Sequence, residues 1–461
     1  MKPLKRWLTL RRPIDRIKDF DEMYSPLNIN EIKPLLSRCM NCSESFCSKN
    51  MMFNNTHIGC PLNIDINKII SLLKYDLIDE AYQELTKNNP FPEITERVCK
   101  GYCETSCINN KENNPVEIKN ILRTLADYGL EKIEAKKSDV ISNKKVSIIG
   151  SGASGLACAN YLVDNGYNVT VYEKEAQPGG TLLYGISNMR LDKKVLNKRI
   201  EILKKKGVTF LTNTEVTRVI SPMDVLSDCD ALVIASGVIK RNFTCKGMGL
   251  KNVMYATDYL KKVTKNILDT GKSNILENKN VLILGCGDTT DDVISYAIRE
   301  KAMMVATVDY KNMPPLKRTT SWPMPDDSIN NNEAIMDARS KMGMDPRSYN
   351  MTIREINGES TVESVKICQV KWDDKKPVLQ EHDQIFPIDV VIISIGNIGF
   401  EEDLINYFDI DIVNKMVDEN NHKNSKNVFI CGEALINNGI TAFAIKDGIK
   451  CAKEVIDYLE A

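Results

Sequence analysis

Apolar side chains recur at helical spacing along the first part of the chain. Three stretches keep this spacing, Ile69–Leu73, Leu77–Leu85 and Val116–Leu130, and they predict short helices. The segment Ser43–Pro61 is polar and irregular, which is typical of a loop. We therefore expect residues 1–140 to form a helical domain with long loops.

The pattern changes at Lys144, where short apolar runs begin to alternate with amphipathic stretches. This alternation predicts the strands and helices of a parallel α/β sheet. Residues 261–279 lie between two such patterns and are expected to be a linker. The expected strands are Lys145–Ile149, Asn168–Tyr172, Val281–Leu284, Met304–Val308, Asp389–Ser394 and Val428–Cys431. The expected helices are Leu156–Asp164, Asp292–Lys301 and Ala442–Leu459.

A glycine-rich turn follows the first predicted strand. Gly150 permits the tight turn, Gly152 lets the backbone approach a pyrophosphate, and Gly155 lets helix and strand pack closely. The helix that starts here offers free N–H groups to phosphates. Glu173 ends the second strand, 18 positions after the third glycine, where an acid accepts hydrogen bonds from a ribose. The unit is predicted to bind a dinucleotide.

A second turn, Gly285-Cys-Gly-Asp-Thr-Thr290, carries only the first two glycines. Thr290 replaces the third glycine. Its side chain must therefore push the helix slightly away from the strand, or be accommodated beside a small residue. The alternative is an ordinary strand-to-helix turn. Two nucleotide folds in one chain indicate two dinucleotides, a tightly held flavin and a diffusing nicotinamide.

Half of the 14 cysteines lie close together near the N-terminus. A disulfide framework is typical of small secreted proteins, so this cluster indicates a metal site instead. Zinc and iron–sulfur clusters compete, and Cys60-Pro61 together with the odd number favours iron–sulfur. His57 is a further candidate ligand, although a loop histidine is commonly only solvated. The seven are Cys39, Cys42, Cys47, Cys60, Cys99, Cys103 and Cys107.

Charge and hydropathy exclude several classes of protein. The 61 Lys and Arg residues balance 62 Asp and Glu residues, so nothing favours nucleic acid. No apolar run reaches the roughly 18 residues of a membrane helix, and the start lacks a secretory h-region. We expect a cytoplasmic protein with no membrane partner. The basic stretch 2–18 lacks the serines of a transit peptide and fits an arm that packs on the protein or on a partner better.

The motifs occur in the order thiolate clusters, flavin-type fold, nicotinamide-type fold. This order resembles the small (beta) subunit of glutamate synthase and its relatives over nearly the whole chain. The resemblance rests on Arg38–Cys42, Gly59–Leu62, Asn89–Glu93, Arg97–Cys99, Cys103–Glu104, Cys107, the first glycine motif, Tyr172–Glu173, Pro178–Gly180, Leu183–Ile186, Leu191–Lys193, Gly287–Thr289, Trp322–Pro323 and Val428–Phe429 before Gly432.

The resemblance implies FAD, NADPH or NADH, and two [4Fe–4S] clusters. One cluster would be held by Cys39, Cys42, Cys47 and Cys107, and the other by Cys60, Cys99 and Cys103. Relatives carry Glu or Gln as the fourth ligand of the second cluster, where this chain has Leu122. Because leucine cannot bind iron, Glu117, His57 or water would replace it, or the cluster would be labile, incomplete or absent.

The resemblance also implies nucleotide-binding residues. For the flavin these are Gly150, Gly152, Ala153, Ser154, Gly155, Glu173, Gly180, Val216, Gly396, Gly432, Glu433 and Thr441. Glu433 departs from the usual Asp. For the nicotinamide they are Gly285, Gly287, Asp288, Thr289, Asp309 and Arg318. Asp309 favours NADH, whereas Lys311, Lys317 and Arg318 favour the 2′-phosphate of NADPH; the balance leans slightly to NADPH.

We therefore expect a multi-domain α+β protein with a helical iron–sulfur domain and two Rossmann-like domains, the nicotinamide domain inserted into the FAD domain. The expected bounds are 1–140 for the iron–sulfur domain, 141–260 together with 389–461 for the FAD domain, and 261–388 for the NAD(P)H domain. Electrons would pass to a glutamate synthase large subunit. The alternatives are a stand-alone oxidoreductase that reduces ferredoxin or small acceptors, and a non-catalytic interaction subunit.

Overall fold

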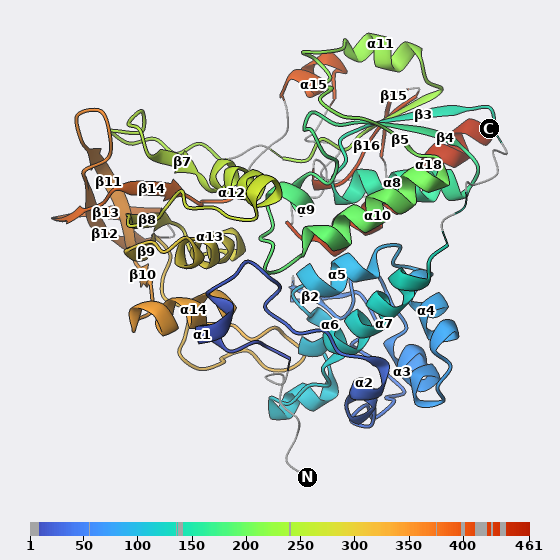
Figure 1. The fold of residues 1–461 in the computed structure, drawn as a ribbon, viewed down its shortest axis with the longest axis horizontal. Coiled ribbons are helices and arrows are strands. Elements are labelled where there is room, and N and C mark those ends of the chain that lie inside the picture. The colour runs from blue at the N-terminus through green and yellow to red at the C-terminus, as the bar shows by residue number, and fades with distance from the viewer. Residues whose placement is uncertain are drawn as a thin grey trace.

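The computed structural model describes residues 9–54, 56–134, 136, 142–238, 241–374, 376–397, 402–410, 422–425, 427–433 and 439–461. A mainly helical part lies at the bottom of Figure 1, and two parts built on parallel sheets lie above and to its left. The first sheet takes strands from both sides of the second along the chain. The second nucleotide domain is therefore inserted into the first, as the sequence predicted.

Local caps fix the ends of the helices in the helical part. Asn28 and Glu31 form a reciprocal capping box at the start of α2, and Asp65 caps α3. The predicted loop 43–61 also contains a short hairpin, β1 (Met51–Phe53) with β2 (Thr56–Ile58). The helices are α2 (Ile29–Leu36), α3 (Ile66–Lys74), α4 (Ile78–Thr86), α5 (Pro92–Val98), α6 (Tyr102–Thr105), η2 (Ile108–Glu112) and α7 (Ile118–Lys132).

The first sheet has the strand order β15-β16-β6-β3-β4-β5. All neighbours are parallel except β15 and β16. Helices α8 and α18 pack on each other beside this sheet. The elements are β3 (Lys145–Ile149), α8 (Ala153–Asp164), β4 (Asn168–Tyr172), α9 (Thr181–Tyr184), α10 (Lys193–Lys206), β5 (Thr209–Leu211), α11 (Pro222–Ser227), β6 (Ala231–Ile234), α15 (Glu402–Tyr407), β15 (Lys423–Ser425), β16 (Val428–Ile430) and α18 (Thr441–Glu460).

The second sheet has the order β10-β9-β8-β14-β7 and is parallel throughout. Its elements are β7 (Val253–Tyr255), α12 (Ala256–Thr270), β8 (Asn280–Leu284), α13 (Asp288–Arg299), β9 (Met304–Asp309), α14 (Glu333–Met342), β10 (Arg347–Tyr349) and β14 (Val390–Ile393).

Two expectations about this region need correction. Most of the expected linker 261–279 is helix α12, because Tyr259, Leu260 and Val263 are buried along one face. Strands β7 and β14 pair in the second sheet, although the expected bounds placed both in the FAD domain. The burial of β14 on both faces explains its apolar sequence but does not say which sheet it joins.

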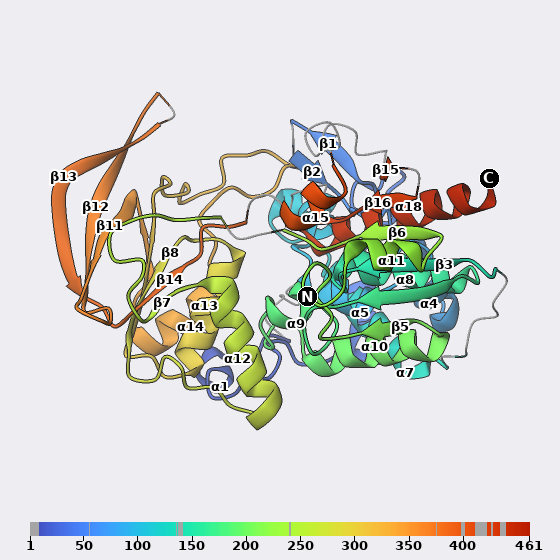
Figure 2. The ribbon, with the colours of Figure 1, turned by 90° about the horizontal axis from the view of Figure 1, so that it is seen from above.

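A three-stranded antiparallel sheet projects from the second part, at the far left of Figure 2. It consists of β11 (Met351–Asn357), β12 (Ser364–Asp373) and β13 (Lys376–Pro387), with β12 in the middle. Nothing in the hydrophobic pattern of residues 351–387 had predicted this sheet.

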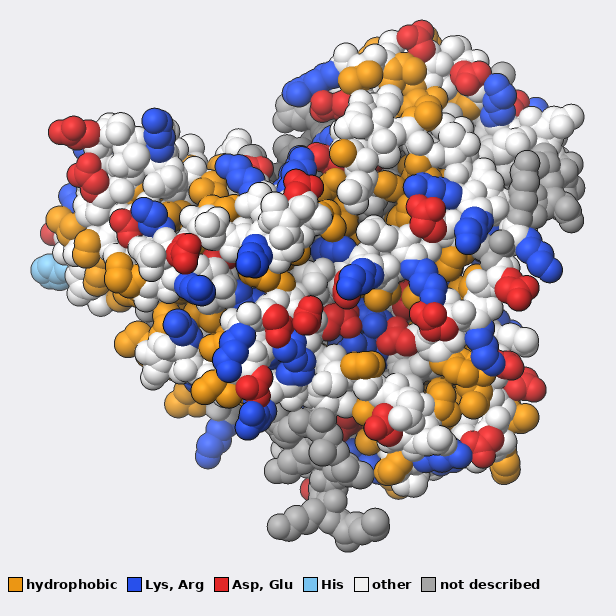
Figure 3. Space-filling model, viewed as in Figure 1, with side chains coloured by type: hydrophobic (Ala, Val, Ile, Leu, Met, Phe, Trp, Pro, Cys, Tyr) orange, Lys and Arg blue, Asp and Glu red, His pale blue; other side chains and the backbone are white. Residues whose placement is uncertain are grey.

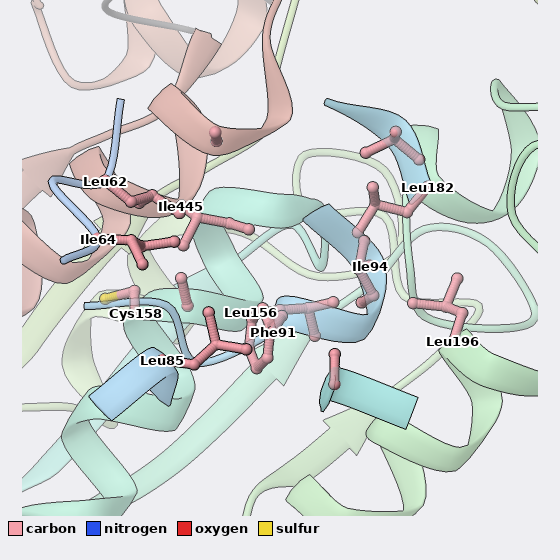
Figure 4. Close-up of a cluster of buried hydrophobic side chains, with 14 of the residues drawn as sticks. Leu62, Ile64, Leu85, Phe91, Ile94, Leu156, Cys158, Leu182, Leu196 and Ile445 are labelled. Atoms are coloured by element: carbon pink, nitrogen blue, oxygen red, sulfur yellow. The ribbon is translucent and has the colours of Figure 1, made fainter. Parts of the chain in front are cut away.

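The helical part and the first sheet share one hydrophobic core. In Figure 4, Phe91, which precedes α5, and Ile94 of α5 lie beside Leu156 of α8, Leu196 of α10 and Ile445 of α18. A buried ion pair joins the same parts, because the guanidinium of Arg199 donates to both carboxylate oxygens of Glu93 at 2.7 and 3.0 Å. Such a shared core fixes the cysteine-bearing part of the chain relative to the first nucleotide unit.

The described part of the basic N-terminus packs on the nicotinamide domain. Helix α1 (Pro13–Arg16) lies against α14, and Arg16 is fully buried. Its Nε donates to Asp337 at 2.6 Å, and Arg299 donates to the other oxygen of Asp337 at 3.0 Å. Within the described ranges, no helix has the length and apolar character needed to cross a bilayer.

Candidate functional site

The first glycine-rich turn has the geometry that its sequence predicts. A Cβ on Gly150, whose φ is +103°, would lie 2.4 Å from the carbonyl oxygen of Ala235. A Cβ on Gly155 would lie 2.1 Å from the carbonyl oxygen of Gly150. A Cβ on Gly152 would meet nothing within 4 Å, because this residue faces open space. The first and third glycines are thus needed for packing, and the second leaves room for a ligand.

Glu173 is buried and organises the turn. One carboxylate oxygen accepts the N–H of Ser151 at 3.2 Å and also the Ser151 hydroxyl, and the other accepts the N–H of Glu175 at 2.8 Å. The Ser151 Oγ in turn accepts the N–H of Gly179 at 2.9 Å. This network holds the loop before α9 against the glycine turn.

A large cavity of about 590 Å³, which we call the central cavity, opens in front of this turn. Val98 and Lys100 of the helical part also line it, on either side of Cys99. The central cavity is therefore shared by all three parts of the chain. The expected site residues that line it are Gly150, Gly152, Ala153, Ser154, Glu173, Gly180, Val216, Asp288, Thr289, Glu433 and Thr441.

The other expected flavin residues lie behind the turn or away from the central cavity. A Cβ on Gly432 would lie 2.2 Å from Ser154 Oγ, and its N–H donates to Asp447 at 2.6 Å. Gly396 is exposed, and its neighbour Asn397 lines the cavity instead. Burial raises the pKa of Glu433.

The second turn resembles the first at its first two glycines but has a different contact at the third position, where Thr290 replaces glycine. A Cβ on Gly285 would lie 2.1 Å from the carbonyl oxygen of Ser394, whereas one on Gly287 would meet nothing within 4 Å. Thr290 is accommodated by a small neighbour, because its hydroxyl donates to Ser394 Oγ at 2.9 Å. Asp309 accepts the N–H of Cys286 at 3.1 Å.

Arg318 lies in the loop between β9 and α14. Its guanidinium donates to the carbonyl oxygens of Thr320 at 2.8 Å and Met324 at 2.6 Å. Neither Asp309 nor Arg318 lines the central cavity. The structure therefore brings Asp288 and Thr289 together with the flavin residues, but not these two.

Charged side chains join the parts around the central cavity. Arg190 donates to Asp292 at 2.9 Å, the Ser187 hydroxyl donates to Asp292 at 2.5 Å, and Lys100 pairs with Asp288 at 2.8 Å. Figure 3 shows acidic and basic side chains side by side where the parts meet. Asp288 was expected at this site from the sequence, whereas Lys100, Arg190 and Asp292 were not, because their partners are far away along the chain.

Lys193 is a further residue that sequence reasoning missed, although the motif Leu191–Lys193 contains it. Its Nζ donates to the carbonyl oxygens of Leu182 at 3.0 Å and Ile186 at 2.7 Å. Burial lowers the pKa of this amine to about 7. Lys193 thereby supports the segment of α9 that lines the central cavity.

The first thiolate set surrounds one small cavity in the helical part. Cys39, Cys42, Cys47 and Cys107 line it together with apolar residues. Burial raises the pKa of Cys47 to about 12. Trp322, from the nicotinamide domain, donates its indole N–H to the carbonyl oxygen of Cys107 at 3.0 Å.

The second thiolate set surrounds another small cavity, lined by Cys60, Cys99 and Cys103. Leu122 lines it too, where the resemblance places the fourth ligand, and so does Glu96. Burial raises the pKa of Cys60 to about 12 and that of Glu96 to about 7.

The remaining candidate ligands lie elsewhere. The ring of His57 contacts that of Phe443 at a tilt, with centroids 4.4 Å apart, and its Nδ1 lies 3.3 Å from Asn50 Oδ1. Glu117 accepts a hydrogen bond from Asn120 at 2.7 Å. Neither residue lines a thiolate cavity.

The thiols of each set line one cavity, as the ligands of a [4Fe–4S] cluster must, each of them binding a different iron. In the described part of the chain, no three His, Cys, Asp or Glu side chains converge closely enough to hold one metal ion.

Two family models match the chain. The model of dihydropyrimidine dehydrogenase domain II, 4Fe-4S cluster, matches residues 16–134, and that of pyridine nucleotide-disulphide oxidoreductase matches residues 144–453. Among solved structures, the fold is similar to Mycobacterium tuberculosis FprA in complex with NADPH. The TM-score is 0.54 at 16% identity, over 69% of this chain and 85% of that one.

Among curated proteins, the glutamate synthase [NADPH] small chain of Bacillus subtilis is 34% identical, over 97% of this chain and 95% of its own length. Glutamate synthase [NADH] of Saccharomyces cerevisiae is 31% identical over 99% of this chain, which spans only 22% of the yeast protein.

The fold and the matches define an NAD(P)H-dependent oxidoreductase that uses FAD and [4Fe–4S] clusters. Within that class, the chain belongs to the glutamate synthase small-chain family.

Proposed function

We propose that the chain takes electrons from NAD(P)H at the central cavity and delivers them to a glutamate synthase large subunit. When bound, FAD accepts a hydride and the clusters carry single electrons. The proposal assigns Cys39, Cys42, Cys47 and Cys107 to one cluster. It assigns Cys60, Cys99 and Cys103 to the other.

The observation that carries the proposal is the shared lining of successive cavities. Val98 and Lys100 line the central cavity, and Cys99 between them lines the second thiolate cavity. At the start of α18, Thr441 lines the central cavity and Ala442 the second thiolate cavity. The flavin site and the second thiolate set are thus separated by single residues.

The two thiolate cavities are neighbours as well, because Ile66 lines both. The first cavity lies nearer the surface, since Met40 lines it and is 67% exposed. We therefore place the electron entry at the central cavity and the exit beside Met40, where the large subunit would dock.

The chain's own residues perform the binding steps. The N-terminus of α8 and the open side of Gly152 receive the flavin pyrophosphate. The start of α13, with Asp288 and Thr289, faces the same cavity and receives the nicotinamide nucleotide. The ion pair between Arg190 and Asp292 fixes that helix against the flavin domain.

The test is an anaerobic titration of the purified chain with NADPH and, separately, with NADH. We expect the flavin absorbance to bleach at once, and the large subunit to be recovered when the tagged chain is isolated from its native host. A flavin that neither nucleotide reduces would contradict the proposal. Recovery of ferredoxin alone would favour the stand-alone oxidoreductase.

A further inference from the structure

We propose that Glu96 is the fourth ligand of the second cluster, in place of Leu122. The ligand set would then be Cys60, Cys99, Cys103 and one carboxylate oxygen. This inference rests on the proposed assignment of a four-iron cluster to the second thiolate set.

The position of Glu96 meets the geometric requirement. It lies in the last turn of α5, three residues before Cys99, and lines the same cavity as all three thiols. Of the residues that line this cavity, Glu96 is the only one with a carboxylate. Oxygen is an acceptable iron ligand, whereas the aliphatic side chain of Leu122 offers no lone pair.

Glu96 is also short of protein partners. It is only 8% exposed, and one of its oxygens accepts a 3.3 Å hydrogen bond from the hydroxyl of Thr95. Its other oxygen has no hydrogen bond or ion pair with the residues that the structure describes. A carboxylate so largely removed from water is costly unless a cation or a proton satisfies it, and the charge of Lys119 supplies only part of this.

The neighbouring acids differ in this respect. Glu93, one turn earlier on α5, is paired with Arg199 through both oxygens. Glu104 accepts the N–H of Lys119 at 2.9 Å and does not line the cavity. Glu96 is thus the acid of this region whose free oxygen remains available to iron.

Lys119 completes the setting. It lines the second thiolate cavity, and its Nζ donates to the carbonyl oxygen of Cys99 at 2.5 Å. Its positive charge would offset part of the negative charge that three thiolates and one carboxylate bring to the cluster. The cavity therefore provides both a fourth ligand and charge compensation.

The test compares the full-length protein with Glu96→Leu, both isolated anaerobically and then briefly exposed to air. We expect about eight irons per chain in the unchanged protein, from two four-iron clusters, with no loss in air. In Glu96→Leu we expect the loss of one iron per chain and the EPR signal of an oxidised three-iron cluster. Flavin content serves as the folding control and should not change.

Two further variants sharpen the assignment. The double variant Glu96→Leu with Leu122→Glu should regain the lost iron, because it moves the carboxylate to another residue that lines the same cavity. Glu117→Gln, a buried glutamate outside the cavity, should keep all its iron. Glu96→Leu with full iron and an unchanged EPR spectrum would overturn the inference.

Glu96→Gln keeps the test decisive if Glu96→Leu does not fold. The amide has the same size but no charge, so a bound oxygen would change the reduction potential and EPR spectrum of the second cluster. Unchanged values in Glu96→Gln would overturn the assignment of Glu96. An unchanged protein without iron and sulfide would instead overturn the proposed clusters themselves.

Discussion

The two glycine-rich turns of this chain perform related tasks with different packing. In the first, Gly155 brings α8 so close that an added Cβ would lie 2.1 Å from a backbone oxygen. In the second, Thr290 occupies the equivalent position, and its hydroxyl bonds Ser394. Both turns keep an open middle glycine, Gly152 or Gly287. The middle position is thus open in both turns, and the packing behind it differs.

This difference separates two features of the fingerprint, the open space that a pyrophosphate would need and the close approach of helix to strand. The pyrophosphate requires free space and backbone N–H groups, and both turns offer the space. The third glycine serves only the approach of helix to strand. In the second turn the small side chain of Ser394 packs against Thr290, so a third glycine is not needed there.

The largest expected effect is a difference in stability between a substitution at Gly155 in the first turn and one at Thr290 in the second. Gly155→Ala should destabilise the flavin domain by about 3 kcal/mol, because a backbone oxygen cannot move aside cheaply. Thr290→Ala should cost only about 1 kcal/mol, the worth of one hydrogen bond. Urea unfolding followed by circular dichroism measures both, and equal losses would contradict the comparison.

The middle glycines provide a matched pair. Gly152→Val should fold normally and contain little or no flavin, since its side chain would occupy the space meant for the pyrophosphate. Gly287→Val should keep its flavin but bind NAD(P)H at least tenfold more weakly. Flavin content and the NAD(P)H titration test both. A Gly152→Val protein with its full flavin content would contradict the assignment of FAD to the first glycine-rich turn.

The packing of such turns could be predicted from the sequence because it is local. The bounds of β3 and β4 also agree with the expected strands, since short apolar runs next to glycine turns are unambiguous. Helix α12 was missed because its apolar residues are diluted by lysine and asparagine. The sheet of β11–β13 was missed because β13 is largely exposed and lacks a buried face.

The candidate site could be predicted only where single motifs define it. Cysteines and glycines have narrow chemical or conformational roles, so their spacing carries information. Arg190, Lys193 and Glu96 act through partners on other elements. A glutamate before a cysteine is ordinary in sequence, and only the cavity shows that it faces the thiols.

The first nucleotide unit contains a buried histidine whose contribution to stability can be tested by changing the pH. In the first unit, His422 is buried between Asp447 and Glu454, at 2.9 and 2.6 Å, and Asp447 also accepts the N–H of Gly432. Burial alone would lower the pKa of His422, but the hydrogen bonds and charges of the two acids outweigh it and leave the pKa raised.

Since the folded pKa of His422 is raised, its stabilisation is complete below the unfolded value near 6.5 and is lost as pH rises through the folded value. The unchanged protein should therefore lose stability relative to His422→Gln over this window, by at most about 1.4 kcal/mol per pH unit. Denaturant unfolding from pH 5 to pH 9 measures the difference. Parallel stability curves would show that the pair of acids does not hold a proton on His422.

The smallest expected effect concerns the choice of nicotinamide in the second unit. If Arg318 binds the 2′-phosphate, Arg318→Ala should raise the KM for NADPH several-fold and leave that for NADH unchanged, because only NADPH carries this group. Two of its N–H groups already bond Thr320 and Met324, so the same change also loosens its loop. Loop loosening alone would raise both constants equally. The ratio of the two KM values therefore separates recognition of the phosphate from support of the loop, and an unchanged ratio would rule out Arg318 as the residue that distinguishes the nucleotides.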